Sequence, residues 1–128
     1  MSDFQQRLDT IYQNDGANPY LDAFDSIEKV AKSLERWLNT PETKVEVEPG
    51  FQARIGQQYN IVLKIPSKNV DDTLFRAYVT PSGRISLDLY DDDPVPCANE
   101  AEMENRLLDF LAKPEVKSRM MIYRKLVH

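Results

Sequence analysis

The sequence predicts an α+β fold: an antiparallel meander of four to five strands with N-terminal and C-terminal helices packed on one face. Apolar residues recur at helical spacing before residue 40 and after residue 99, and they alternate with polar residues between 44 and 89. Short turns with Gly or Pro separate the alternating runs, which favours antiparallel neighbours. The 128 residues have the length of a single domain, 1–128.

Two helices are expected before residue 40. The first carries a short apolar stripe made up of Phe4, Leu8, Ile11 and Tyr12. Asn18 and Pro19 are typical of a cap and a first helical residue, so a second helix begins there. Its broader stripe consists of Tyr20, Phe24, Ile27, Ala31, Leu34 and Leu38, widened by Leu21, Val30 and Trp37.

Residues 44–89 have the two-residue period of strands. Their inward positions are Val45, Val47, Phe51, Ala53, Ile55, Tyr59, Ile61, Leu63, Ile65, Phe75, Ala77, Val79, Ile85, Leu87 and Leu89. Turns are expected at Pro49-Gly50 and at Pro81-Ser82-Gly83, and the longest loop at 66–72. The inward set lies on one face, so the helices should cover that face and leave the other open.

Two more helices follow an acidic, proline-containing loop at residues 91–96. Asn99 with Glu102 resembles a capping box that begins the first of them. The apolar stripe of this helix contains Met103, Leu107, Phe110 and Leu111, and Pro114 interrupts it. A last stripe contains Val116, Met120, Tyr123 and Val127.

Composition narrows the class of protein. Hydrophobic residues make up 41% and charged residues 29%, which is typical of a folded globular chain. The N-terminus has no secretory signal pattern, and Cys97 is the one cysteine, so we expect a cytoplasmic protein of bacterial or phage origin without a membrane segment. The net charge of -5 argues against nonspecific binding to nucleic acid.

The predicted open sheet face is the first candidate site. Arg54, Arg76, Tyr78, Arg84 and Tyr90 fall on outward positions, as does Leu74. Arg and Tyr are enriched at protein interfaces, so this face predicts partner binding. A solvated face that only covers the sheet is the plainer interpretation, and stacking of single-stranded RNA is a further alternative.

Acidic and basic residues fall in separate segments of the C-terminal part of the chain. Asp91, Asp92 and Asp93 lie beside the sheet face and predict contact with a basic protein surface. The spacing of a calcium loop fails at its glycine position, so no metal site is expected. Residues 113–128 are basic and include Met120 and Met121, which leaves open an amphipathic contact with an acidic groove or with a second copy in a homodimer.

No catalytic residue and no cofactor are predicted. His128 is the last residue, Cys97 has no adjacent base, and no phosphate-loop or zinc spacing occurs. We therefore predict a non-enzymatic protein-binding module: an adaptor, chaperone, inhibitor or immunity-type protein. In size and composition the chain resembles secretion chaperones and immunity proteins, although no motif carries that resemblance. The alternatives are a small enzyme or ligand-binding domain using carboxylates such as Asp88 or Asp91, and single-stranded nucleic-acid binding.

Overall fold

A computed structural model describes residues 3–13, 18–90 and 93–127 of the chain, apart from the side chains of 12 and 13. The helices are α1 (Asp3–Gln13), α2 (Pro19–Leu38), α3 (Glu100–Leu111) and α4 (Pro114–Leu126), with a 3-10 turn η1 (Pro66–Lys68). The strands are β1 (Lys44–Ala53), β2 (Gly56–Ile65), β3 (Val70–Val79), β4 (Ile85–Asp88) and β5 (Val95–Cys97).

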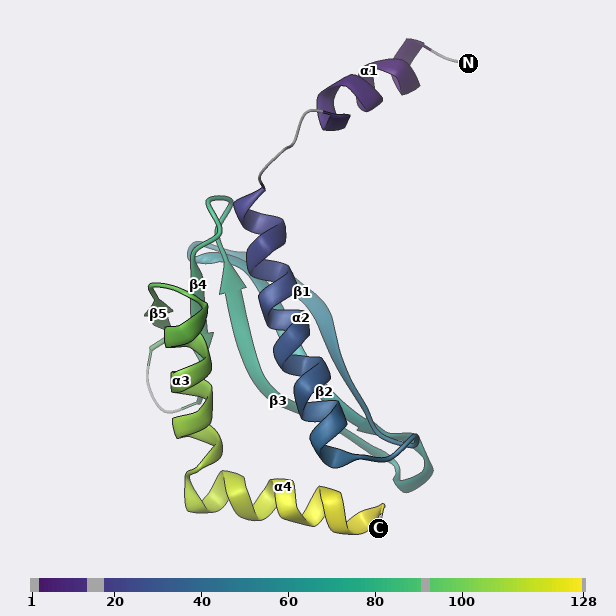
Figure 1. Cartoon of the computed structure of the whole chain (residues 1–128), viewed down its shortest axis with the longest axis vertical. Helices are drawn as coiled ribbons and strands as arrows, with labels where there is room; N and C mark the ends of the chain where they lie inside the picture. Colours follow the sequence, from purple (N-terminus) through teal and green to yellow (C-terminus); the bar gives the residue numbers. More distant parts are fainter. Residues whose placement is uncertain (1–2, 14–17, 91–92, 128) are drawn as a thin grey trace.

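The five strands form one antiparallel sheet in sequence order, β1-β2-β3-β4-β5. Figure 1 shows α2 crossing the long strands and α3 lying over the β4 and β5 side, with α4 below both. The predicted α+β fold with a meander sheet is therefore confirmed. No helix among the described residues has both the length and the apolar character needed to cross a membrane.

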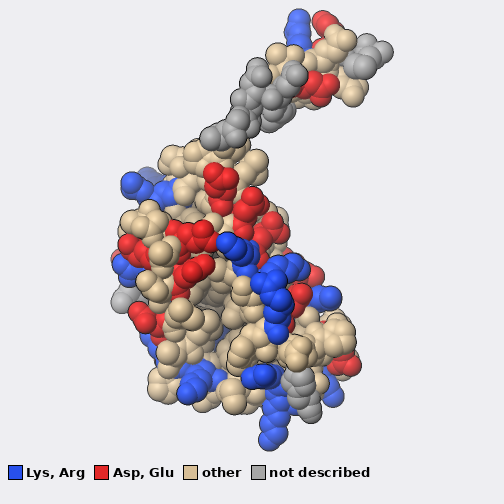
Figure 2. Space-filling model, viewed as in Figure 1, with Lys and Arg blue, Asp and Glu red and all other residues tan. Residues whose placement is uncertain are grey.

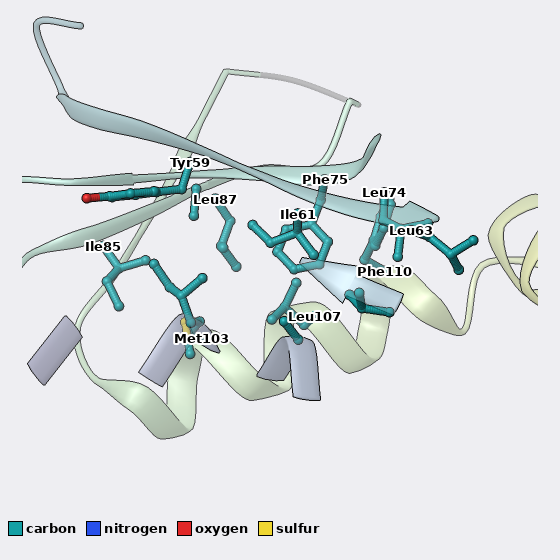
Figure 3. Packing of buried hydrophobic residues seen from close by; sticks show 14 of the residues in the cluster. Tyr59, Ile61, Leu63, Leu74, Phe75, Ile85, Leu87, Met103, Leu107 and Phe110 are labelled. Carbon is teal, nitrogen blue, oxygen red and sulfur yellow. The ribbon is translucent and has the colours of Figure 1, made fainter. Parts of the chain in front are cut away.

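The helix-facing side of the sheet holds the core. Inward side chains of β2, β3 and β4 point towards Met103, Leu107 and Phe110 of α3 (Figure 3). Phe75 and Phe110 meet edge to face, with ring centroids 6.5 Å apart. Helices α2 and α3 begin at the predicted Asn caps, because Asn18 Oδ1 accepts from Leu21 N at 3.1 Å and Asn99 Oδ1 from Glu102 N at 2.8 Å.

Helix α1 forms where its apolar stripe predicted it, but the stripe does not enter the core. Phe4 is 71% exposed and Ile11 is 65% exposed, and the described side chains of α1 all face solvent. Figure 1 shows α1 standing away from the sheet and from the other helices. Of the terminal helices, α2, α3 and α4 build the helical layer.

The first hairpin differs from the predicted pattern. β1 continues through Pro49 and Gly50 with a register shift between Pro49 and Gln52, as at a β-bulge, so the predicted turn is wrong. The turn lies at Arg54 and Ile55 instead. β1 is an edge strand, where proline needs no ladder partner, and this explains why the strand passes through it.

Two further differences come from β-pairing that alternation does not reveal. The β2/β3 register shifts between the pairs Ile61↔Phe75 and Val62↔Thr73, and the extra residue, Leu74, is buried in the core instead of facing outward. Part of the predicted acidic loop also becomes β5, which pairs with β4 through Leu87↔Val95 and Ile85↔Cys97. A short strand containing a proline gives too weak a pattern to be predicted.

Candidate functional site

The structure brings two of the predicted sheet-face residues together. The Arg76 guanidinium carbon lies 5.7 Å from the Tyr90 ring centroid, and Arg76 Nε donates to Asn60 Oδ1 at 3.0 Å. Tyr90 OH donates to Thr73 O at 3.0 Å. The backbone of Tyr90 has a φ of 71°, a region that aromatic residues seldom adopt. Arg76 and Tyr90 thus form a defined polar cluster beyond β4.

The other predicted partner-binding residues lie elsewhere. Tyr78 is only 8% exposed, and its hydroxyl accepts from Gln58 Nε2 at 3.0 Å. Arg54 is at the tip of the β1/β2 hairpin instead of on the sheet face, and Arg84 is an exposed residue just before β4. Asp93 is exposed, whereas the predictions for Asp91 and Asp92 fall outside the described residues.

The charges on this side of the sheet are largely paired with one another. Lys64 Nζ lies 3.2 Å from a Glu46 carboxylate oxygen and 3.0 Å from one of Glu48. Arg76 on β3 likewise contacts Asn60 of the neighbouring strand and the Tyr90 ring. On the reverse side of the sheet, Lys64 and Arg76 therefore already have polar partners on the neighbouring strand.

A different surface is apolar and hollow. A groove with a volume of about 560 Å³ lies between α2, α3 and α4. We call it the helix groove, and its lining consists of Lys29, Val30, Ser33, Leu34, Trp37, Glu104, Leu107, Leu108, Leu111, Lys117, Met120 and Met121. Figure 2 shows a hollow between α2 and α3, with Lys and Arg side chains over α2 and α4.

The helix groove has a buried floor and an exposed rim. Leu107 and Met120 are buried and form the floor, which is continuous with the core. Leu108 on the rim is 63% exposed and Trp37 is 41% exposed. A cluster of apolar rim side chains that water reaches is typical of a binding surface, since single exposed apolar residues are normally scattered.

Polar contacts hold α4 in place below the groove. Tyr123 OH donates to Asp72 Oδ2 at 2.5 Å, and Arg119 Nε lies 3.6 Å from the same oxygen. Burial and the hydrogen bond with Asp72 raise the pKa of Tyr123 to about 12. The Arg124 guanidinium carbon lies 4.7 Å from the Trp37 ring centroid, which ties α4 to the end of α2.

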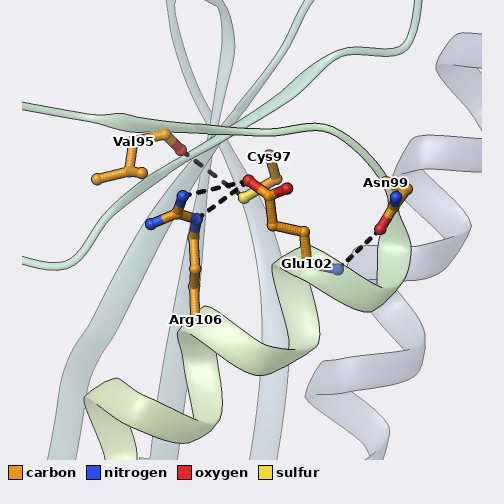
Figure 4. Close-up of polar contacts among 5 residues, drawn as sticks. All are labelled: Val95, Cys97, Asn99, Glu102 and Arg106. Carbon is orange, nitrogen blue, oxygen red and sulfur yellow. Dashed lines mark hydrogen bonds and ion pairs between the residues drawn. The ribbon is translucent and has the colours of Figure 1, made fainter.

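Cys97 is a buried residue at the end of β5, beside α3. Its Sγ faces the carbonyl of Val95 at 3.7 Å, while Glu102 pairs with Arg106 at 3.2 Å next to it (Figure 4). Burial raises the pKa of the Cys97 thiol, so the thiolate is disfavoured at neutral pH. Cys97 has the chemistry of a small core residue.

Carboxylates do not converge on the groove. Within the described ranges, no group of three or more His, Cys, Asp or Glu side chains is close enough to hold a metal ion. Glu104 lines the groove, whereas Asp88 belongs to β4, where it lies opposite Arg76 in the β3/β4 ladder. The groove offers an apolar contact surface with charged groups at its margin.

Sequence reasoning did not find the helix groove. The signal was present in the breadth of the α2 stripe, because Val30 and Trp37 exceed what one core-facing stripe needs. Trp37, which widens the predicted stripe, lies on the groove rim. Met120 and Met121 were connected with an amphipathic contact, and both line the groove. No family model, curated protein or solved structure matches the chain.

Proposed function

We propose that this chain is a non-enzymatic protein-binding module of the cytoplasm, and that its binding surface is the helix groove. The observation that supports it is the apolar hollow itself: three helices leave Trp37, Leu108 and Met121 exposed around a floor of core residues. The buried thiol of Cys97, the one cysteine of the chain, supports a reducing compartment.

The shape of the groove favours a helix as its ligand. Amphipathic helices bind in apolar grooves through side chains at positions i, i+3 or i+4, and i+7. The lining includes Met120 and Met121, whose flexible thioether side chains adapt to different apolar partners. Lys29 and Lys117 outnumber Glu104 among the charged lining residues, which favours a ligand with acidic flanks.

The Arg76 and Tyr90 cluster is the remaining part of the predicted sheet-face site. Because its groups already bond to Asn60 and Thr73, a partner there gains fewer new contacts than in the groove. The cluster would act as a secondary contact whose charge affects the rate of association.

The proposal is tested by affinity capture with matched variants. Wild-type chain, Leu108→Glu and Met121→Glu are immobilised, and a protein retained by the wild type is identified, purified and titrated again. Asn105→Glu is the control, because Asn105 is exposed on α3 but does not line the groove. We expect binding to weaken at least about tenfold in both groove variants, since a buried unpaired carboxylate costs well over 1.4 kcal/mol.

Equal binding by all of these variants would contradict the groove as the binding surface. Loss of binding only in Tyr90→Ala would move the site to the sheet face. Binding whose affinity falls steeply with added salt, and which needs nucleic acid in the sample, would favour the nucleic-acid alternative.

A further inference from the structure

Among the described residues, no other element buries the apolar stripe of α1. Phe4, Leu8 and Ile11 lie on one side of the helix and all three are exposed. A helix of 11 residues is too short to be stable alone in water, so its amphipathic face needs a surface to cover it. The stripe is an unpartnered helical ligand within the chain.

The helix groove has the complementary properties. The spacing of Phe4, Leu8 and Ile11, at i, i+4 and i+7, is that of the anchors of a helix bound in a groove. The groove is walled by three helices and floored by core residues. The molecule thus contains both a short amphipathic helix and an apolar groove.

Charge also favours this pairing. α1 contains Asp3 and Asp9 against Arg7, so it is acidic by one charge. α4, which forms one wall of the groove, is basic: it contains Lys117, Arg119, Arg124 and Lys125 against Glu115. An acidic helix lying along a basic wall gains favourable long-range electrostatics and a preferred orientation.

We propose that the helix groove binds α1 of a second copy of this chain, and that two copies exchange their α1 helices reciprocally. This inference rests on the proposed function of the groove. α1 already stands away from its own domain with the stripe exposed (Figure 1), so exchange requires no refolding of α1. Reciprocal exchange buries two stripes for one association and closes the assembly at a dimer. A helix from another protein must then displace α1 to bind.

Disulfide trapping tests the exchange directly. Chains carrying Leu8→Cys and chains carrying Leu108→Cys are mixed under mild oxidation, and the rate of covalent dimer formation is followed on nonreducing gels. The native Cys97 is buried and serves as an internal background. The control replaces Leu8→Cys by Gln6→Cys, which lies on the opposite side of α1.

We expect the Leu8/Leu108 mixture to form dimer at least roughly tenfold faster than the control, because docking raises the effective concentration of the two thiols. Sedimentation of the uncrosslinked full chain should show a dimer that dissociates in Leu8→Glu and in Leu108→Glu. Gln6→Glu adds the same charge away from the stripe and should remain dimeric.

Two results would overturn the exchange. One is a wild-type chain that sediments as a monomer at every concentration, with equal trapping rates for Leu8 and Gln6. The other is a chain carrying both Leu8→Cys and Leu108→Cys that crosslinks only within itself, which would show that α1 covers its own groove. In both cases partner capture that depends on Leu108 would still support the proposed function, so the two failures are distinguishable.

Discussion

The two sides of the sheet differ in what covers their side chains. On the reverse side, Lys64, Arg76 and Tyr78 each bond to a neighbouring strand, so a single layer satisfies its own polar groups. On the other side three helices cover the apolar face, but an apolar groove remains between them, with buried Leu107 in its floor. The difference teaches that an apolar groove arises where a helical layer remains incomplete, even when the other sheet face carries the residues typical of interfaces.

The largest expected effect on stability is a difference between two neighbouring leucines of α3. Leu107 is 3% exposed on the groove floor, so Leu107→Ala should lower the free energy of unfolding by about 2–5 kcal/mol. Leu108→Ala removes the same atoms from an exposed position and should change it by less than about 0.5 kcal/mol. Urea denaturation measures both. Equal losses would show that the rim is part of the core and that the groove is not open.

A smaller effect is expected on the reverse side of the sheet. Tyr78→Phe leaves the buried Gln58 amide without the acceptor it has at 3.0 Å, which should cost about 1–3 kcal/mol. Tyr90→Phe loses an exposed hydrogen bond to Thr73 and should cost less than Tyr78→Phe in the same denaturation series. A larger loss of stability in Tyr90→Phe than in Tyr78→Phe would mean that the hydrogen bond of Tyr90 matters more than that of Tyr78.

The sequence predicted most helices and strands of the two layers, but it did not predict the β-bulge in the sheet or the groove between the helices. Helical periods, two Asn caps and strand alternation depend on neighbouring residues, so α2, β2, β3 and α3 were predictable. The bulge that buries Leu74 depends on pairing between strands, which alternation along one strand does not record.

The helix groove was not predictable for a similar reason. Whether Trp37 and Leu108 are buried depends on the distance between α2, α3 and α4, and a helical stripe gives only the direction in which a side chain points. Of the predicted site residues, Arg76 and Tyr90 lie together, but only the position of Arg76 follows from strand alternation, because Tyr90 comes after the end of β4 with a φ of 71°. Arg54 was misplaced because the hairpin turn was assigned to Pro49-Gly50.

The smallest expected effect concerns the contact that holds α4. At pH 8, Tyr123→Phe should cost about 1 kcal/mol through the lost hydrogen bond to Asp72. Folding raises the pKa of Tyr123 from 10.0 to about 12, so its stabilisation is complete below pH 10 and is lost as the pH rises towards 12. Wild type and variant should therefore converge in stability between pH 10 and pH 12, as measured by chemical denaturation.

A constant difference across that range would show that Tyr123 does not gain its stability from the protonated hydroxyl. Tyr59→Phe provides a comparison inside the core, because burial and the hydrogen bond with Tyr20 also raise the pKa of Tyr59 to about 12. It should show the same convergence without affecting the position of α4.

Strand β1 lies at an edge of the sheet, and its residues protect that edge. A ten-residue edge strand is a template on which foreign backbone can add and start aggregation. Here Glu35 of α2 accepts from the Val45 amide at 2.9 Å near the start of β1, and Pro49, further along the strand, has no amide hydrogen to donate. The charged residues Lys44, Glu46 and Glu48 alternate along the same part of the strand. Backbone addition at β1 is thereby disfavoured, which leaves the helical layer as the surface for the proposed contact between copies.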